Sequence, residues 1–204
     1  MVQKIGIFGG TFDPPHIAHL VLASEACDQF SLDRLLWVLT PMPPHKGGQS
    51  ITETSHRLEM VRRAIKSDPH FELSTVELDR PGPQYAVDTV REIQQANPGA
   101  ELTYLFGEDS LRDILTWHDP GTFISYCQFL GVMRRPGVQV DLDDLEGHLT
   151  GLREKIRWLE CPLLEIASHD IRERIRGGHP FRYFLPEEVS KYIVDKKLYG
   201  FKIN

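Results

Sequence analysis

The segment that most constrains the fold is residues 6–19, with the sequence GIFGGTFDPPHIAH. The short apolar run at residues 4–8 contains branched side chains, which is typical of a strand. From Ile17 onward the sequence has helical periodicity, and one face carries Ile17, Leu20, Val21, Ser24 and Cys27. Pro14 and Pro15 can lead into this helix, because proline is tolerated in a first helical turn. The chain therefore begins with a strand, a tight turn and the start of a helix.

Two histidines, His16 and His19, fall in the first turn of this helix and share a face. A helix N-terminus offers unpaired N–H groups and a partial positive charge, so two imidazoles beside it suit a polyphosphate. The expected ligand is a nucleoside triphosphate. Taken alone, a glycine pair is usually a turn and a histidine is usually a cap or a surface residue, but their conjunction favours a phosphate site.

Two common nucleotide-binding patterns are missing from the sequence. Gly6, Gly9 and Gly10 do not form G-x-G-x-x-G, and G-x-x-x-x-G-K-[ST] occurs nowhere in the chain. These observations argue against a nicotinamide-dependent dehydrogenase and against a P-loop NTPase.

Composition limits the class of protein and its partners. The 204 residues, 41% of them hydrophobic, fit one domain with a sizeable core. A net charge of -6, from 23 basic and 29 acidic side chains, gives no broad basic surface, so a nucleic-acid partner is not expected. Cys27, Cys127 and Cys161 are far apart and form no C-x-x-C, which favours reduced thiols and no zinc site. No run approaches the ~20 apolar residues of a membrane span, so we expect a cytoplasmic protein without a membrane partner.

Apolar runs and helical patterns alternate along the rest of the chain. Strands are predicted at residues 34–40, 102–106, 129–133 and 163–166, and a strand or edge hairpin at 71–78. Helices are predicted at residues 56–65, 86–95, 109–117 and 142–156, from about residue 170, and from residue 186. Such alternation predicts a doubly wound α/β fold, in which crossover helices cover both faces of a parallel sheet.

Ligands of such folds collect at the carboxyl ends of the strands, near the point where the strand order reverses. Four segments rich in glycine, proline or polar residues follow predicted strands, namely residues 9–19, 41–48, 107–109 and 166–172. We therefore expect these four segments to meet in one site.

Six motifs in these and neighbouring segments resemble those of a known family. They are GGTFDPPHIAH at residues 9–19, PMPPHK at 41–46, YAVDT at 85–89, GED at 107–109 followed by Trp117, RRPG at 134–137 and IASHDIR at 166–172. In this order they resemble the bacterial nicotinate mononucleotide adenylyltransferases, which belong to the nucleotidyltransferase superfamily with the (H/T)-x-G-H signature. The tail from Phe184 to Tyr199 is similar as well, so the resemblance runs nearly from end to end.

The resemblance implies a Rossmann-like nucleotidyltransferase fold over residues 1–204, a single domain whose helical C-terminal part, from about 166 to 204, completes the ATP site. It implies transfer of AMP from ATP to nicotinate mononucleotide, giving deamido-NAD and pyrophosphate, with Mg²⁺ carried by the ATP phosphates and no protein metal site. Three alternatives stay open: nicotinamide mononucleotide as the preferred acceptor with NAD as product, a related reaction on phosphopantetheine, and a nucleotide-binding module without turnover. A homo-oligomer also stays open.

The resemblance also assigns site residues. It implies catalytic roles for His16, His19, Lys46 and Arg172. The ATP-binding residues it implies are Gly9, Gly10, Thr11, Phe12, His16, His19, Gly107, Asp109, Ser168, His169 and Arg172. The mononucleotide-binding residues it implies are Asp13, Lys46, Tyr85, Thr89, Trp117, His118 and Arg135.

Some of these roles are specific. Asp109 resembles the residue that binds the adenosine ribose, and Trp117 resembles the aromatic residue that stacks on the pyridine ring. Ser168 is expected to cap the helix that follows it. Three positions depart from the family pattern: Ala18 replaces the usual glycine, and Ala86 and His169 replace threonine.

Overall fold

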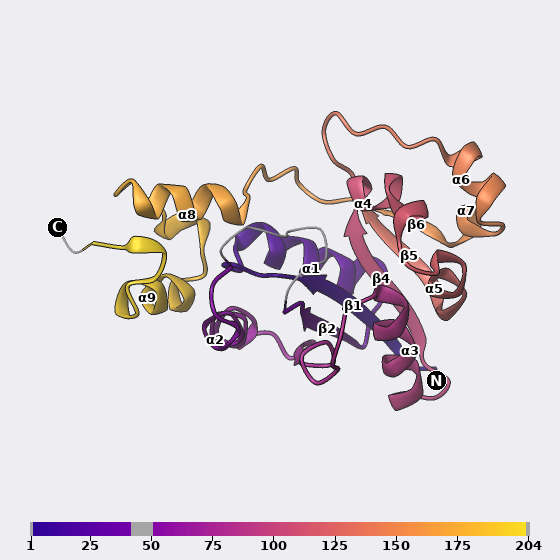
Figure 1. Cartoon of the computed structure of the whole chain (residues 1–204), viewed down its shortest axis with the longest axis horizontal. Helices are drawn as coiled ribbons and strands as arrows, with labels where there is room; N and C mark the ends of the chain where they lie inside the picture. Colours follow the sequence, from indigo (N-terminus) through magenta and orange to yellow (C-terminus); the bar gives the residue numbers. More distant parts are fainter. Residues whose placement is uncertain (1, 42–50, 203–204) are drawn as a thin grey trace.

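The predicted parallel sheet is present in the computed structural model, which describes residues 2–41 and 51–202 (Figure 1). Its strands are β1 (Lys4–Gly10), β2 (Arg34–Leu39), β3 (Phe71–Ser74), β4 (Glu101–Gly107), β5 (Cys127–Met133) and β6 (Ile156–Leu159). They form one sheet in the order β3-β2-β1-β4-β5-β6, and every neighbouring pair is parallel. The order reverses between β1 and β4, so the doubly wound α/β fold is confirmed.

Helices connect the strands. They are α1 (Ile17–Gln29), α2 (Thr54–Ile65), α3 (Ala86–Ala96), α4 (Glu108–Arg112), α5 (Pro120–Tyr126), α6 (Leu142–His148), α7 (Leu152–Lys155), α8 (Ser168–Arg176) and α9 (Glu187–Asp195). Short 3₁₀ turns are η1 (Ile114–Thr116), η2 (Arg182–Phe184) and η3 (Leu198–Gly200). Figure 1 shows α8 and α9 at one end of the molecule and α6 and α7 at the other. Within residues 2–41 and 51–202, no helix has the length and apolar character that a membrane crossing requires.

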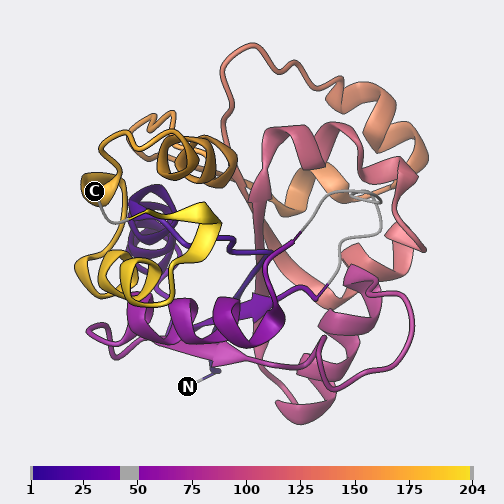
Figure 2. The ribbon, with the colours of Figure 1, turned by 60° about the vertical axis from the view of Figure 1, so that its left-hand side comes forward.

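The sheet separates two apolar cores. Strand β2 contributes Leu35, Trp37 and Leu39 to one core and Leu36 and Val38 to the other. Because both faces are covered, its sequence is continuously apolar from Leu35 to Leu39 instead of alternating. The first core also contains side chains of α1, α2, α8 and α9, and Figure 2 shows these C-terminal helices beside α1 and α2. The second core is closed by α3, α5 and α6.

The segment from residue 142 to 166 differs from its prediction. One helix was expected over residues 142–156, but it stops at His148, and Gly151 has a φ of 83° before α7 begins. Ile156 starts the edge strand β6, which the sequence reading missed. The strand predicted at 163–166 is wrong: those residues have no regular structure, and Leu163 is 62% exposed. Leucines spaced three or four residues apart therefore predicted one long helix where the structure has two short helices and a strand.

Three smaller differences lie elsewhere. The helix predicted at 109–117 is divided into α4 and η1, and α5 was not predicted, although Asp119 caps it by accepting a hydrogen bond from the backbone N–H of Thr122. Strand β3 ends at Ser74, and the chain then turns through a hydrogen bond from the Thr75 hydroxyl to Asp79. None of these differences changes the order of the strands.

Candidate active site

His16 and His19 lie together at the start of α1, where the chain leaves β1. The backbone N–H of His16 donates a hydrogen bond to Nδ1 of His19 at 3.1 Å. The two imidazole rings stack with their centroids 3.6 Å apart. Because Nδ1 of His19 accepts this bond, the proton of the neutral ring is on Nε2. His19 therefore keeps one N–H with which to meet a ligand.

Both histidines are neutral at pH 7. His16 is only 5% exposed, and burial together with the nearby positive charge of Arg135 lowers its pKa to about 4. Burial, His16 and Arg135 lower the pKa of His19 well below its usual range. The free protein thus holds two uncharged imidazoles beside a guanidinium, and this arrangement favours a ligand that brings negative charge.

The turn before the histidines is built on tight packing. Phe12 is buried, has a φ of 46°, and its ring lies 5.2 Å from that of His19, centroid to centroid. A Cβ at Gly10 would lie 2.9 Å from the Phe12 ring, and a Cβ at Gly9 would lie 3.1 Å from the Tyr104 hydroxyl. A side chain at either glycine would therefore force the neighbouring aromatic ring to shift.

The N-terminal turn of α8 is fastened to the same turn. The hydroxyl of Ser168 donates to the carbonyl of Pro14 at 2.8 Å, and the guanidinium of Arg172 donates to the carbonyl of Asp13 at 2.7 Å. The predicted cap at Ser168 is wrong, since Ala167 occupies the cap position and the hydroxyl bonds to another segment. Sequence segments 150 residues apart thus meet at this turn, as the topology predicts.

His169, the neighbour of Ser168, faces solvent. Its side chain is 64% exposed, and its Nε2 lies 3.1 Å from a carboxylate oxygen of Glu173 one turn along α8. In the free protein this imidazole pairs with an acid and has no contact with the histidine pair among the interactions of the described residues.

The Asp13 carboxylate is occupied within the protein. It is 4% exposed; Oδ1 accepts a hydrogen bond from the Tyr199 hydroxyl at 2.7 Å, and Oδ2 accepts one from the backbone N–H of Thr52 at 3.1 Å. This predicted mononucleotide-binding residue therefore joins three segments of the chain beneath the turn.

Arg57, in the first half of α2, was missed by the sequence reading. It is 1% exposed and makes five hydrogen bonds of 2.8 to 3.2 Å. The acceptors are the carbonyls of Thr11, Thr40, Pro41 and Thr52 and the hydroxyl of Thr54. One guanidinium thus ties together the loops after β1 and β2 and the start of α2. A signal was available, because Arg57 lies one turn before the inward-facing Val61.

A second group of predicted residues gathers at the end of β4. Asp109 lies in the first turn of α4, and its Oδ1 is 3.5 Å from Nε of Arg135. The carboxylate of Glu108 accepts a hydrogen bond from the backbone N–H of Arg135 at 2.9 Å. A Cβ at Gly107 would collide with the Asp109 carboxylate. Both ionic side chains are about half exposed, so they remain accessible to a ligand.

Several aromatic side chains lie after β4 and at the start of α3. Trp117 is half-buried, with its ring centroid 5.7 Å from that of Phe106 and 5.2 Å from that of Phe123. Tyr85 and His118 stack at a centroid distance of 4.2 Å. Three of the residues predicted to bind the mononucleotide are therefore aromatic rings with partly open surfaces, a suitable surface for a planar ligand.

Thr89 is placed differently from these rings. It is fully buried, and its hydroxyl donates to a carboxylate oxygen of Glu77 at 2.8 Å while it accepts from the guanidinium of Arg80 at 3.3 Å. Glu77 is itself buried, and its second carboxylate oxygen has no hydrogen-bond partner. The Thr89 hydroxyl is thus engaged inside the protein, a fact that its sequence position did not reveal.

Two of the sequence-based assignments concern residues or ions that the structure does not test. Lys46 lies outside the described residues. In residues 2–41 and 51–202, no group of three histidine, cysteine, aspartate or glutamate side chains could hold a metal ion.

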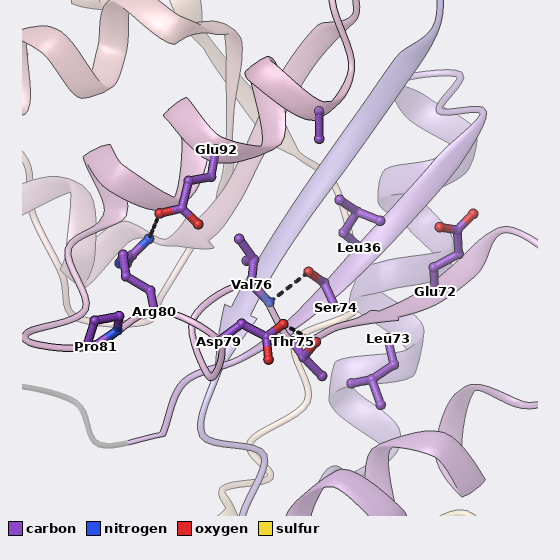
Figure 3. A pocket seen from close by; sticks show the side chains of 11 residues that line it. Leu36, Glu72, Leu73, Ser74, Thr75, Val76, Asp79, Arg80, Pro81 and Glu92 are labelled. Carbon is purple, nitrogen blue, oxygen red and sulfur yellow. Dashed lines mark hydrogen bonds and ion pairs between the residues drawn. The ribbon is translucent and has the colours of Figure 1, made fainter.

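A hollow of about 760 Å³ opens elsewhere, beside the edge strand β3 (Figure 3). Leu36 of β2 and Ser74 of β3 line one side, and Arg80 lines the other, where it pairs with Glu92 of α3 at 3.0 Å. No residue assigned to a site from the sequence lines this hollow. The candidate site is therefore defined by the chemistry of its side chains and not by this hollow.

Comparisons with known proteins show what the chain is similar to. The family model described as cytidylyltransferase-like matches residues 7–174. A probable nicotinate-nucleotide adenylyltransferase of Thermomicrobium roseum is 41% identical over 198 residues, covering 97% of this chain and 92% of that protein. The nicotinate-nucleotide adenylyltransferase of Bacillus subtilis is 37% identical over 198 residues, covering 97% of this chain and 99% of that protein.

Solved structures share the fold. The nicotinic acid mononucleotide adenylyltransferase of Plasmodium falciparum complexed with NaAD has a TM-score of 0.79 at 19% identity, covering 99% of this chain and all of that one. The same enzyme complexed with APC gives a TM-score of 0.78 at 18% identity and the same coverage.

Proposed function

Because the chain belongs to the cytidylyltransferase-like family and, within it, to the nicotinate-nucleotide adenylyltransferases, we propose that the turn carrying His16 and His19 is where it transfers AMP from ATP to nicotinate mononucleotide. The products are deamido-NAD and pyrophosphate, so the enzyme catalyses a step of NAD biosynthesis. The Plasmodium falciparum enzyme of similar fold was solved with NaAD, which supports the same pair of substrates here.

The observation that carries this proposal is the stacked histidine pair at the start of α1, with α8 fastened to the same turn. The 5′-phosphate of the mononucleotide is already an anionic nucleophile, so no general base is needed. Its oxygen forms a new bond to the α-phosphorus of ATP, the bond from that phosphorus to the bridging oxygen breaks, and the oxygen leaves with pyrophosphate. What the protein must supply is alignment and charge stabilisation.

The residues divide between the two substrates. His16, His19, the glycine turn and the start of α8 face the triphosphate, with Asp109 on the ribose. Arg135 lies close enough to shift the titration of both histidines, so it suits the phosphates that meet between the two substrates. Trp117 and the Tyr85–His118 stack suit the pyridine ring.

Two components of the reaction come from outside the described residues. We assign Lys46 to the phosphates, as a cation that balances their charge. Mg²⁺ enters as the Mg–ATP complex, held mainly by phosphate oxygens and water, which agrees with the small number of protein ligands that this ion usually takes beside nucleotides.

The test is pyrophosphate release from Mg–ATP and nicotinate mononucleotide. Replacing His19 with alanine should lower the rate by two or more orders of magnitude while the protein still folds, because the imidazole N–H that stabilises the phosphate charge is lost. His148 on α6 provides a matched control, since its side chain is 62% exposed and remote in sequence from every motif. Equal rates for His19→Ala and His148→Ala would contradict this assignment.

The acceptor is tested by comparing three compounds. We expect the highest kcat/KM with nicotinate mononucleotide, a lower value with nicotinamide mononucleotide and no transfer to phosphopantetheine. A higher value with nicotinamide mononucleotide would make NAD the direct product. Binding of ATP without turnover of any acceptor would indicate a nucleotide-binding module.

A further inference from the structure

One partly buried hydrogen bond connects the two ends of the described chain. The Tyr199 hydroxyl donates to Oδ1 of Asp13 at 2.7 Å across 186 residues of sequence. The second carboxylate oxygen accepts from the backbone N–H of Thr52, and the carbonyl of Asp13 accepts from Arg172. Asp13 stands between the left-handed Phe12 and the histidine pair, so whatever fixes Asp13 also fixes the turn.

Tyr199 has an unfavourable backbone conformation in this position. Its φ is 58° and its ψ is 23°, in the left-handed region that residues with a side chain rarely adopt. Lys197 before it and Gly200 after it also have positive φ values, of 52° and 76°. A tyrosine persists in such a conformation only where surrounding contacts determine it. Here those contacts include Asp13 and the sulfur of Met60 at 3.7 Å.

The Tyr199 hydroxyl stays protonated at neutral pH and can therefore donate a hydrogen bond. Burial, followed by the charge of Asp13, raises the pKa of Tyr199 above its usual range. Arg172 of α8 and Arg57 of α2 are the cations that face this group. Tyr199 is therefore the donor of this bond in the free protein.

We propose that Tyr199 is a positioning residue for adenylyl transfer: through the Asp13 carboxylate it holds the turn between Phe12 and His16, so that His16 and His19 meet the triphosphate in one arrangement. Tyr199 itself does not touch the substrates. Together with Ser168 and Arg172, it makes the C-terminal part of the chain a brace for the phosphate turn. This inference rests on the proposed function and adds a residue that none of the sequence-based assignments contained.

The test compares Tyr199→Phe with Tyr183→Phe in the full-length protein. The first removes one buried hydroxyl and keeps the ring, whereas Tyr183 is 94% exposed and loses an equivalent group to solvent. With Mg–ATP and nicotinate mononucleotide, we expect Tyr199→Phe to lower kcat/KM for ATP about tenfold or more, as for a lost hydrogen bond to a charged group. The KM for the mononucleotide should change less than twofold, and Tyr183→Phe should match the wild type.

A second readout does not depend on turnover. The imidazole proton and carbon resonances of His16 and His19 should move in Tyr199→Phe, while those of the exposed His70 and His148 stay in place. Unchanged resonances, or equal increases in KM for both substrates, would overturn the proposal, since the latter marks general loosening. A variant that fails to fold would overturn it too, because the hydroxyl would then serve the whole fold. If the wild type itself transfers nothing, the proposed function fails and the resonances alone decide the role of Tyr199.

Discussion

His16 links the candidate site to the stability of the protein, because its imidazole is buried uncharged. In the unfolded chain its pKa is near 6.5, and in the folded protein burial and Arg135 lower it to about 4. Between these values the unfolded state binds more protons, so the free energy of unfolding must fall as the pH falls. The stabilisation is fully present above pH 6.5 and lost progressively toward pH 4, by up to about 3 kcal/mol for this one group.

The corresponding experiment is urea unfolding at pH 7, 6 and 5 for the wild type and His16→Gln. Glutamine cannot take up a proton, so the free energy of unfolding of the variant should decline less over this range. His148→Gln, changed at an exposed position of α6, should follow the wild type. Parallel curves for the wild type and His16→Gln would show that His16 titrates normally in the folded protein.

Arg57 makes a second prediction for a single side chain. Replacing it with methionine keeps much of its volume but leaves four partly buried carbonyls without their donor, so we expect a loss of about 3 kcal/mol or more in the free energy of unfolding. Arg62→Met on the same helix, at an exposed position, should change it by less than about 0.5 kcal/mol. Denaturant unfolding measures both, and similar losses would contradict the role of Arg57.

At the level of single residues, the sequence predicted site residues that are positioned by neighbouring segments, but not residues whose partners lie far away in the sequence. His16 and His19 were found because the turn, the prolines and the helix start that position them are contiguous. Arg57 and Tyr199 were missed because their partners come from other segments, mainly as backbone carbonyls and one buried carboxylate. The spacing of Arg57 from Val61 indicates an inward-facing position, but no pattern of residue types encodes its hydrogen bond to a carbonyl 46 residues away.

At the level of elements, the segment around α6 and α7 shows the limit of periodicity. Leucines recur at helical spacing through it, yet Gly151 adopts a φ of 83° and Glu146 accepts hydrogen bonds from the backbone N–H groups of Gly151 and Arg153. The left-handed glycine is the N-cap of α7, two residues after Leu149, the C-cap of α6. The spacing of hydrophobic residues indicates which face is buried, but it does not indicate a backbone angle that interrupts the helix.

Two glycines of this segment should respond with opposite signs to the same substitution. Gly151→Ala forces an alanine into the left-handed region and should lower the free energy of unfolding by about 1 kcal/mol. Gly147→Ala adds a methyl group to an exposed helical position with nothing within 4 Å, and should raise it by about 0.5 to 1 kcal/mol. Urea unfolding of the two variants measures both. Loss of stability in both would mean that α6 does not continue through Gly147.

At the level of the whole molecule, strand order and layering followed from the alternation of apolar runs and helical patterns. Five of the strands were expected near their observed positions, and parallel crossovers then leave few arrangements. Which helices would share a core could not be predicted in this way. Ile171, Ile175, Val189 and Ile193 of α8 and α9 pack in the same core as Trp37 of β2, because the chain returns to α1 and α2 after β6.

This shared core predicts that the C-terminal part, from about residue 166, does not unfold on its own. Its apolar side chains have no separate core, and Ser168, Arg172 and Tyr199 bond to the turn before α1. In native-state hydrogen exchange at increasing urea, the amides of α9 should therefore open with the same free energy and denaturant dependence as those of β1, as one cooperative unit. Earlier opening of α8 and α9, while β1 stays protected, would instead make the C-terminal part a separately folding lid. It would also predict that ATP, which in the proposed site meets both parts, raises the protection of α8 and α9 far more than that of β1.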